Sequence, residues 1–427
     1  MKSTSACCEK HVCLILGIVV ALGSGLAASP KTPPPTHIDN VVETLHGVRI
    51  VDPYRWLEDQ ESPETRAWIE AQNQHTRSIL DAVPGRERLR AALERLYRVD
   101  EMSAPIFRGN RYFLFKRSAQ QNLRTICVRE RLDGADRVLL DPANMSPDQS
   151  VSVHLMSISR DGKLLAYGVQ RGGEDEIVVE LLDVDTGQRL ADRLPRATYY
   201  NLSILPDKSG FYYSRRQSTG TRLYFHAMGT EIASDREIFG EGFDDQKLIW
   251  FRFSEDGRYI AAFVNDGGGS GSRTRIYTLD RARQQRFQPL VEDIEANFSG
   301  AFGGDHLFVR TTWNAPNGRL LDIDLKDPRR ERWREVIPES KAVLEDAAPA
   351  GGKLVASFLE NVSTRLKVFD TTGKLFSEIA LPTLGTAWAA WARWESDEIF
   401  YHFTSFAQVG ETYRYARTGP PGISRRP

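Results

Sequence analysis

The sequence predicts a mainly β protein, a seven-bladed β-propeller preceded by a short α-helical segment. Seven short segments rich in apolar and aromatic residues recur along the chain, and their first residues lie 45 to 52 positions apart. They begin at Arg111, Lys163, Gly210, Arg258, His306, Lys353 and Glu398. A polar turn containing Gly, Asp or Asn precedes most of them, as at Asp161-Gly162. A repeat of this length that holds several short strands is typical of a propeller blade.

Each repeat contains a second strand-like run after the aromatic segment. Such runs are Thr125–Val128, Ile177–Leu182, Arg275–Leu279 and Leu366–Phe369, each followed by a turn. We therefore expect the aromatic segment to form the inner strand of a blade and the second run to follow it. A series of unrelated β-sandwiches is the alternative, and the regular spacing favours a propeller over residues 99–415.

Residues 29–98 precede the first repeat and predict two helices. Ser62 is a suitable N-cap for a helix that starts at Pro63 and runs through Asp81. A second helix from Gly85 or Arg86 to Tyr97 places Leu89, Leu93 and Leu96 on one face. These helices do not belong to a propeller, and their apolar faces need a partner to cover them.

The first 28 residues have the order of a secretory signal peptide. A charged start with Lys2 and Lys10 precedes an apolar run, 12–22, and then small residues up to Ala28. A transmembrane anchor is the alternative, but it needs about 20 apolar residues. We expect a cleaved leader at residues 1–28 and an exported protein, in a bacterial periplasm, with no membrane attachment after the leader is removed. Cys127 is then the one cysteine left, so no internal disulfide forms.

The last residues, 416–427, differ from the rest of the chain. They are rich in Pro, Gly and Arg and have no strand pattern, so we expect this tail to add no strand to a blade. The change in composition suggests out-of-frame translation after Tyr415. The hypothesis is a frameshifted or truncated gene.

Neither the composition nor the motifs of the chain give a reason to expect a nucleic-acid partner or a cofactor. The chain has 427 residues, is 41% hydrophobic and carries a net charge of −1, so no basic field predicts nucleic-acid binding. No His-Glu-x-x-His motif occurs, and the spacing of the cysteines predicts no metal site. Gly268–Ser272 comes nearest to a nucleophile elbow but ends in Ser rather than Gly, and we interpret it as a hairpin connection. Neither the scattered histidines nor the paired carboxylates form a recognisable catalytic pattern.

Residues 46–59 carry the most specific motif of the chain. Asp52–Asp59 reads Asp-Pro-Tyr-Arg-Trp-Leu-Glu-Asp, follows His46-Gly47 and is followed by Glu-Ala-Gln-Asn at 70–73. Together with 157–167, 210–215 and 223–230, this region resembles the prolyl oligopeptidase family of serine peptidases, and the resemblance spans about Thr36 to Tyr415. It implies a seven-bladed propeller that covers an active site and admits short peptides, which are cut after proline.

The resemblance also implies a hydrolase domain, formed by the N-terminal helical segment and the part that follows the propeller. The triad residues of the family belong to that following part, so no catalytic residue is carried over to this sequence and the chain is expected to be inactive alone. Two alternatives remain open: a stand-alone propeller that binds peptides or proteins, and a subunit that pairs with a separately encoded hydrolase half. Short peptides are the expected ligands, and we expect an unpaired helical segment to promote aggregation.

Overall fold

The computed structural model describes residues 32–266, 273–416 and 424–425. The chain folds into two compact units, Met1–Tyr97 and Arg98–Pro427, which are described separately below. None of the helices in the described ranges combines the length and the apolar composition needed to cross a bilayer.

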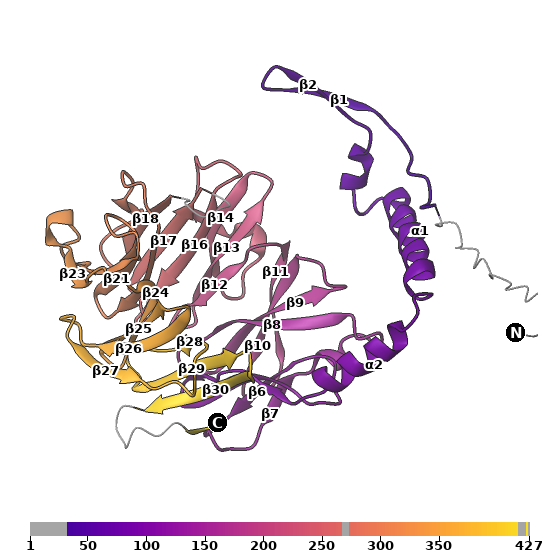
Figure 1. The fold of residues 1–427 in the computed structure, drawn as a ribbon. Coiled ribbons are helices and arrows are strands. Elements are labelled where there is room, and N and C mark those ends of the chain that lie inside the picture. The colour runs from indigo at the N-terminus through magenta and orange to yellow at the C-terminus, as the bar shows by residue number, and fades with distance from the viewer. Residues whose placement is uncertain (1–31, 267–272, 417–423, 426–427) are drawn as a thin grey trace, which may run out of the picture. The chain divides into compact units, whose positions relative to one another are not determined.

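The N-terminal unit contains a hairpin and two helices (Figure 1). Its elements are β1 (Val41–Leu45), β2 (Val48–Asp52), the 3₁₀ turn Arg55–Glu58, α1 (Pro63–Leu80) and α2 (Arg86–Tyr97). The Ser62 side chain accepts a hydrogen bond from the Thr65 amide, and Pro63 occupies the first turn, which confirms the predicted start of α1. The β1–β2 hairpin was not predicted from the sequence.

The tryptophans of this unit pack together, whereas the leucines of α2 are exposed. The rings of Trp56 and Trp68 meet edge to face with centroids 6.5 Å apart. The Trp56 indole donates to the His37 carbonyl at 3.0 Å and the Trp68 indole to the Thr36 hydroxyl at 3.0 Å, so the preceding segment lies along α1. Leu89, Leu93 and Leu96 are all exposed, so the predicted apolar face of α2 is present and uncovered.

The second unit is a propeller of seven antiparallel sheets, and Figure 1 shows the blades following one another around a ring. Blade 1 is β3 (Glu101–Met102), β4 (Ile106–Arg108), β5 (Arg111–Arg117), β6 (Thr125–Arg129) and β7 (Arg137–Leu140). Blade 2 is β8 (Val151–Ile158), β9 (Leu164–Arg171), β10 (Ile177–Asp183) and β11 (Arg189–Ala197). Blade 3 is β12 (Asn201–Ile204), β13 (Gly210–Gln217), β14 (Gly220–Ala227) and β15 (Arg236–Phe239). Blade 4 is β16 (Leu248–Phe253), β17 (Tyr259–Asn265), β18 (Thr274–Asp280) and β19 (Gln288–Val291).

The remaining three blades have the same antiparallel order. Blade 5 is β20 (Phe298–Gly303), β21 (His306–Thr311), β22 (Arg319–Asp324) and β23 (Arg334–Ile337). Blade 6 is β24 (Val343–Ala350), β25 (Lys353–Glu360), β26 (Ser363–Phe369) and β27 (Leu375–Ile379). Blade 7 is β28 (Thr386–Trp391), β29 (Glu398–Ser405), β30 (Gln408–Ala416) and β31 (Ser424–Arg425). The predicted fold class, seven blades after a short helical segment, is confirmed.

The aromatic segments do not form the inner strands, and this expectation was wrong. They form β9, β13, β17, β21, β25 and β29, which are the second strands of their blades, and β5 in blade 1. The first strands of blades 2 to 6 contact one another in succession, which places them on the side of the blades that faces the axis. The second strands are the most apolar because the blades on both sides bury them, as in β17, where Tyr259–Val264 are all buried.

The tail also differs from its expectation. Ser424 and Arg425 form β31, which pairs with Arg414 and Tyr413 of β30 and adds a short outer strand to blade 7. Pairing at a sheet edge uses backbone N–H and C=O groups, so it does not require an alternating side-chain pattern. The other residues of the tail, 417–423 and 426–427, lie outside the described residues.

Shared hydrophobic clusters join neighbouring blades. Separate clusters bridge blades 1 and 2, 2 and 3, 3 and 4, 4 and 5, 5 and 6, and 6 and 7. Among the described residues, no such cluster joins blade 7 to blade 1, and no sheet combines strands from both ends of the propeller. The ring therefore closes through a seam with a different structure from its other blade contacts.

Candidate functional site in the propeller channel and at the seam

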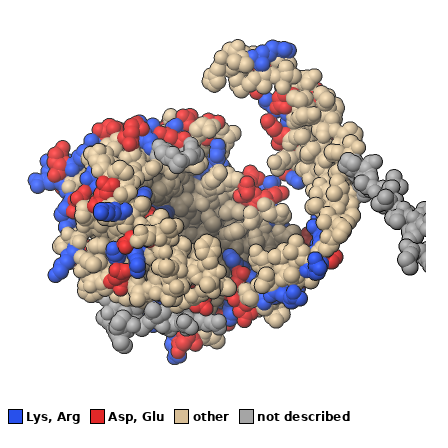
Figure 2. Space-filling view, in the orientation of Figure 1, with Lys and Arg blue, Asp and Glu red and all other residues tan. Residues whose placement is uncertain are grey.

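The first strands of the blades surround an axial channel, and Figure 2 shows the propeller hollowed in the middle of its blades. A cavity of about 500 Å³ lies in this channel against the first strands of blades 1 to 4. Ile106, Leu155, Ser203 and Phe251 are among its lining residues. A cavity of this size is in the range of small-molecule and peptide sites.

One mouth of this channel is crossed by residues 392–397, which connect β28 to β29 in blade 7 and which we call the crossing loop. The Glu255 carboxylate of blade 4 accepts hydrogen bonds from the Trp394 amide at 2.9 Å and from the Arg393 guanidinium at 3.3 Å. On blade 2, Arg160 donates to both oxygens of Glu395, at 2.9 and 2.8 Å.

Blades 5 and 6 also hold the crossing loop. The Trp394 ring packs near Phe308 of blade 5, with centroids 6.1 Å apart. The amides of Gly351 and Gly352, in the first turn of blade 6, donate to the carbonyls of Arg393 and Trp394 at 2.8 and 3.0 Å. A loop of blade 7 that contacts blades 2, 4, 5 and 6 lies across this mouth of the channel.

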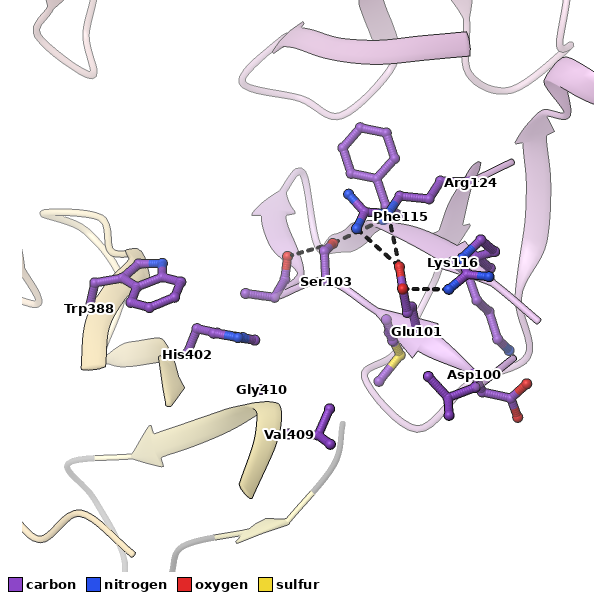
Figure 3. A pocket seen from close by; sticks show the side chains of 14 residues that line it. Asp100, Glu101, Ser103, Phe115, Lys116, Arg124, Trp388, His402, Val409 and Gly410 are labelled. Atoms are coloured by element: carbon purple, nitrogen blue, oxygen red, sulfur yellow. Dashed lines mark hydrogen bonds and ion pairs between the residues drawn. The ribbon is translucent and has the colours of Figure 1, made fainter. Parts of the chain in front are cut away.

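A second cavity, of about 440 Å³, lies at the seam between blades 1 and 7 (Figure 3). Blade 1 supplies a polar wall, where Glu101 accepts hydrogen bonds from Arg117 and from Arg124. Blade 7 supplies Trp388 and His402, whose ring centroids lie 4.7 Å apart. One wall is charged and the other is aromatic, an arrangement that can bind a peptide with both polar and apolar groups.

His402 has a restricted environment on this wall. Burial lowers the pKa of His402 below its ordinary value, so the imidazole is neutral at neutral pH. A Cβ atom at Gly410 would lie 2.4 Å from the His402 Nε2 atom, so only glycine fits there without displacing the ring. The position of His402 therefore depends on the absence of a side chain on β30.

Few direct contacts hold the seam together. The Tyr112 hydroxyl of blade 1 donates to the Glu398 carboxylate of blade 7 at 2.9 Å, and its ring meets Phe400 edge to face at 6.5 Å. Burial and the hydrogen bond to Glu398 together raise the pKa of Tyr112 to about 12, so the hydroxyl stays protonated and donates.

Three of the described histidines are paired with acceptors rather than with nucleophiles. His37 lies 3.0 Å from Glu64, His154 lies 2.9 Å from Gln170 and His306 lies 2.6 Å from Asp322. None of these pairs includes a hydroxyl or thiol, so they do not resemble the base of a serine peptidase. The glycine-rich segment 268–272, interpreted from the sequence as a hairpin connection, lies outside the described residues.

His226 forms a buried cluster that the sequence did not reveal. Its Nδ1 atom lies 2.6 Å from Asp235 and its Nε2 atom 3.0 Å from Asp192, and the imidazole is fully buried. A carboxylate oxygen lies within hydrogen-bond distance of each ring nitrogen, so both nitrogens have a polar partner. This cluster connects blades 2 and 3. Because both nitrogens are engaged, the ring cannot serve as a base, and its role is structural.

Metal coordination finds no support in the described ranges, where no group of three or more His, Cys, Asp or Glu side chains is placed to hold an ion. Cys127 is buried, and burial raises the pKa of its thiol, so it is a poor nucleophile at neutral pH.

Sequence reasoning did not identify the residues that line the channel or cross it. A signal was present in the first strands, where an arginine interrupts apolar runs at Ile106-Phe107-Arg108 and Phe251-Arg252-Phe253. Charged residues in an otherwise apolar strand can face a solvated interior. The crossing loop had no such signal, because its contacts with blades 2 and 4 join residues more than one hundred positions apart.

Comparison with known proteins assigns the fold to a family. Residues 33–419 match the family model described as prolyl oligopeptidase, N-terminal β-propeller domain. A prolyl endopeptidase of Elizabethkingia meningoseptica is 28% identical over 422 residues, which cover 96% of this chain and 58% of that protein. Prolyl oligopeptidase A of Amanita bisporigera is 26% identical, with 89% of this chain and 55% of that protein covered.

Solved structures agree. A structure from a study of two prolyl endopeptidases matches with a TM-score of 0.83 and 30% identity, covering 92% of this chain and 60% of that one. Prolyl oligopeptidase B of Galerina marginata has the same fold, with a TM-score of 0.77 at 23% identity. The chain thus spans about 58% of the length of the first curated relative that it matches. The resemblance found in the sequence is confirmed, and the chain belongs to the prolyl oligopeptidase family, whose N-terminal β-propeller domain it contains.

Proposed function

We propose that this chain supplies the N-terminal segment and the propeller of a serine-type oligopeptidase that cleaves short peptides after proline. The observation that carries the proposal is the match of residues 33–419 to the family's propeller domain. In this proposal the propeller restricts access to the active site, because the crossing loop lies across one mouth of its channel. Peptides then reach the channel through the other mouth or through the seam.

In this proposal the chain does not hydrolyse peptides by itself. Its paired histidines contact carboxylates or an amide, and catalysis by a serine peptidase needs a serine, a histidine and an acid held in contact. Hydrolysis would then need a hydrolase half supplied by residues outside this sequence, on the same polypeptide or on a separate one.

The test is hydrolysis of a short chromogenic peptide with proline before the scissile bond. The purified chain is assayed alone and after addition of lysate from its source organism. We expect no hydrolysis by the chain alone. Hydrolysis by the purified chain alone would contradict the proposal. If the chain alone is inactive but the mixture hydrolyses more peptide than the lysate does by itself, the result would support a split peptidase.

A peptide-binding propeller without peptidase activity is the second candidate. The cavity of about 500 Å³ favours it, because a channel cavity of this size can hold a ligand without chemistry. Binding of a short peptide without any increase in hydrolysis on adding lysate would favour this function over the first.

We also propose that the protein is exported to a periplasm by residues 1–28. The support is the order of charged, apolar and small residues in that segment, which lies outside the described residues. Cell fractionation followed by N-terminal sequencing tests this: a mature chain that begins at Ser29 is expected, and an intact Met1 in the cytoplasm would contradict it.

A further inference from the structure

Two arginines at the end of the channel that the crossing loop spans lie against the cavity, and neither has an acidic ion-pair partner among the described residues. Arg108 ends β4 in blade 1, and Arg252 lies near the end of β16 in blade 4, so each precedes the turn at the same end of its blade. Both line the cavity of about 500 Å³. We call them the channel arginines.

The channel arginines use little of their hydrogen-bonding capacity. One nitrogen of Arg108 donates to the Phe107 carbonyl at 2.8 Å, and one nitrogen of Arg252 donates to the Phe251 carbonyl at 3.4 Å. The Arg252 guanidinium also lies over the Trp250 ring, 5.0 Å from its centroid. A guanidinium has five N–H donors in a planar fork, so most donors of both side chains remain available.

The charges around the cavity are unequal. Four arginines and one glutamate line it, namely Arg108, Arg160, Arg252, Arg393 and Glu255. Glu255 is bound by Arg393 and the Trp394 amide, and Glu395 of the crossing loop is bound by Arg160. These pairs account for two arginines and two glutamates, which leaves the channel arginines as the excess positive charge.

Neighbouring charges do not neutralise this excess. Burial, followed by the positive charge of Arg393, lowers the pKa of Arg108 to about 10, although Glu255 acts in the opposite direction. Burial also lowers the pKa of Arg252. The negative charge of Asp346 on blade 6 acts in the opposite direction, and it has the same effect on the pKa of Arg310. In the described part of the chain, no carboxylate forms an ion pair with Arg108 or Arg252. An enclosed cation without a counter-charge is unfavourable, and an anion would relieve this cost.

We propose that the channel arginines bind a carboxylate, such as the C-terminal carboxylate of a short peptide that enters the channel with that end first. A planar carboxylate accepts two parallel hydrogen bonds from a guanidinium, which matches the free donors at this end. The crossing loop lies across the mouth beyond them and obstructs further passage, so we expect a peptide to stop at the channel arginines. This site is independent of hydrolysis and holds whether or not the proposed peptidase function is correct.

Isothermal titration calorimetry on the full chain tests the proposal with two ligands that differ in one group. The ligands are acetyl-Ala-Ala-Pro with a free carboxylate and the same peptide with a C-terminal amide. We expect the acid to bind at least tenfold more tightly than the amide and its advantage to shrink as salt is raised. Equal affinity of the two peptides would overturn the proposal.

Variants locate the site. Arg108→Gln and Arg252→Gln should each reduce the affinity for the acid about tenfold and leave the weak binding of the amide unchanged, since an Arg–carboxylate pair supplies a charge-assisted bond. Arg131→Gln, a variant of an exposed arginine that pairs with Asp133, is the matched control and should bind as the wild type does. If the control loses as much affinity for the acid as the channel variants do, the assignment of the site to the channel arginines is contradicted.

Further measurements separate a peptide end from a free anion and from misfolding. Acetate and inorganic phosphate are titrated against the wild type, and both should bind more weakly than the peptide acid. If phosphate binds as tightly as the peptide acid, the site takes free anions and the peptide assignment is wrong. Circular dichroism melts show which variants are folded, and the comparison of acid with amide needs the wild type alone.

Discussion

The N-terminal unit and the propeller bury their apolar residues to very different degrees. Thr65 is the one side chain of the described N-terminal unit that is fully buried, and Leu96 on α2 is 73% exposed. In the propeller, second strands such as β17 are buried along almost their whole length. The helices of the N-terminal unit follow local signals, whereas the stability of the propeller comes from packing between blades. Correct secondary structure therefore does not imply a complete core.

The largest expected difference between the two regions comes from truncating one apolar side chain in each. Phe263 is fully buried between blades 4 and 5 and stacks on Trp250 at 4.1 Å. Phe263→Ala should lower the free energy of unfolding by about 3–5 kcal/mol, because it removes buried contacts and leaves a cavity.

The matched variant for that comparison is Leu96→Ala on α2. Since Leu96 is exposed, its loss should change the free energy of unfolding by less than about 0.5 kcal/mol. Denaturant titrations followed by tryptophan fluorescence measure both variants. Similar losses in the two variants would show that α2 is covered in solution.

The second prediction concerns the buried polar cluster of blades 2 and 3. His226→Ala leaves Asp192 and Asp235 buried without the imidazole that both carboxylates contact, so it should destabilise the propeller by about 3 kcal/mol. His154→Ala is the control, because His154 is exposed and contacts the polar side chain of Gln170. Chemical denaturation measures the free energy of unfolding of both variants. If His226→Ala lowers it by less than the control does, the cluster is dispensable for stability.

Acid should weaken the same cluster. Burial acts to raise the pKa of Asp192, but hydrogen bonds from the Gly229 amide and His226 outweigh it and hold the pKa below its ordinary value. The stabilisation is therefore present above the unfolded-state pKa of about 3.9 and is lost as the pH falls through the lower folded-state value. The difference in the free energy of unfolding between wild type and His226→Ala should therefore shrink in acid. A difference that grows in acid would contradict this prediction.

A smaller effect is expected at the start of α1. Ser62→Ala removes the side chain that caps the Thr65 amide, which should cost about 1 kcal/mol of local helix stability. Amide hydrogen exchange is the suitable measurement, because it reports on α1 separately from the propeller. Ser78→Ala, near the other end of the same helix, should leave protection of the first turn unchanged. Equal protection of the first turn in Ser62→Ala and wild type would argue against the cap.

The smallest effect on folding, and a clear effect on association, should come from the exposed face of α2. Leu89→Glu with Leu96→Glu replaces two exposed leucines, so it should reduce concentration-dependent light scattering and leave the unfolding of the propeller unchanged. Gln74→Glu with Ser78→Glu adds the same two charges at exposed polar positions of α1. If the control suppresses scattering equally, net charge rather than the apolar face controls association.

The repeat, the number of blades and the start of α1 could all be predicted from the sequence. These features depend on patterns within about fifty residues: a turn before each aromatic segment, and a Ser-Pro cap before the helix. The order of strands within a blade was assigned wrongly, because an apolar segment does not show whether it lies on the axis or one strand away. The β31 edge was missed for a related reason, since backbone pairing leaves no side-chain pattern.

The contents of the channel, by contrast, depend on how the blades assemble. The contacts of Glu255 with Trp394 and of Arg160 with Glu395 join distant blades, and they form only because the ring brings blade 7 across the axis. In the same way, the sequence pattern marks Arg108 and Arg252 separately, and only the assembled ring places both against one cavity. Local propensities determine where each strand forms. Closure of the ring determines which charged side chains form ion pairs and which remain without an opposite charge.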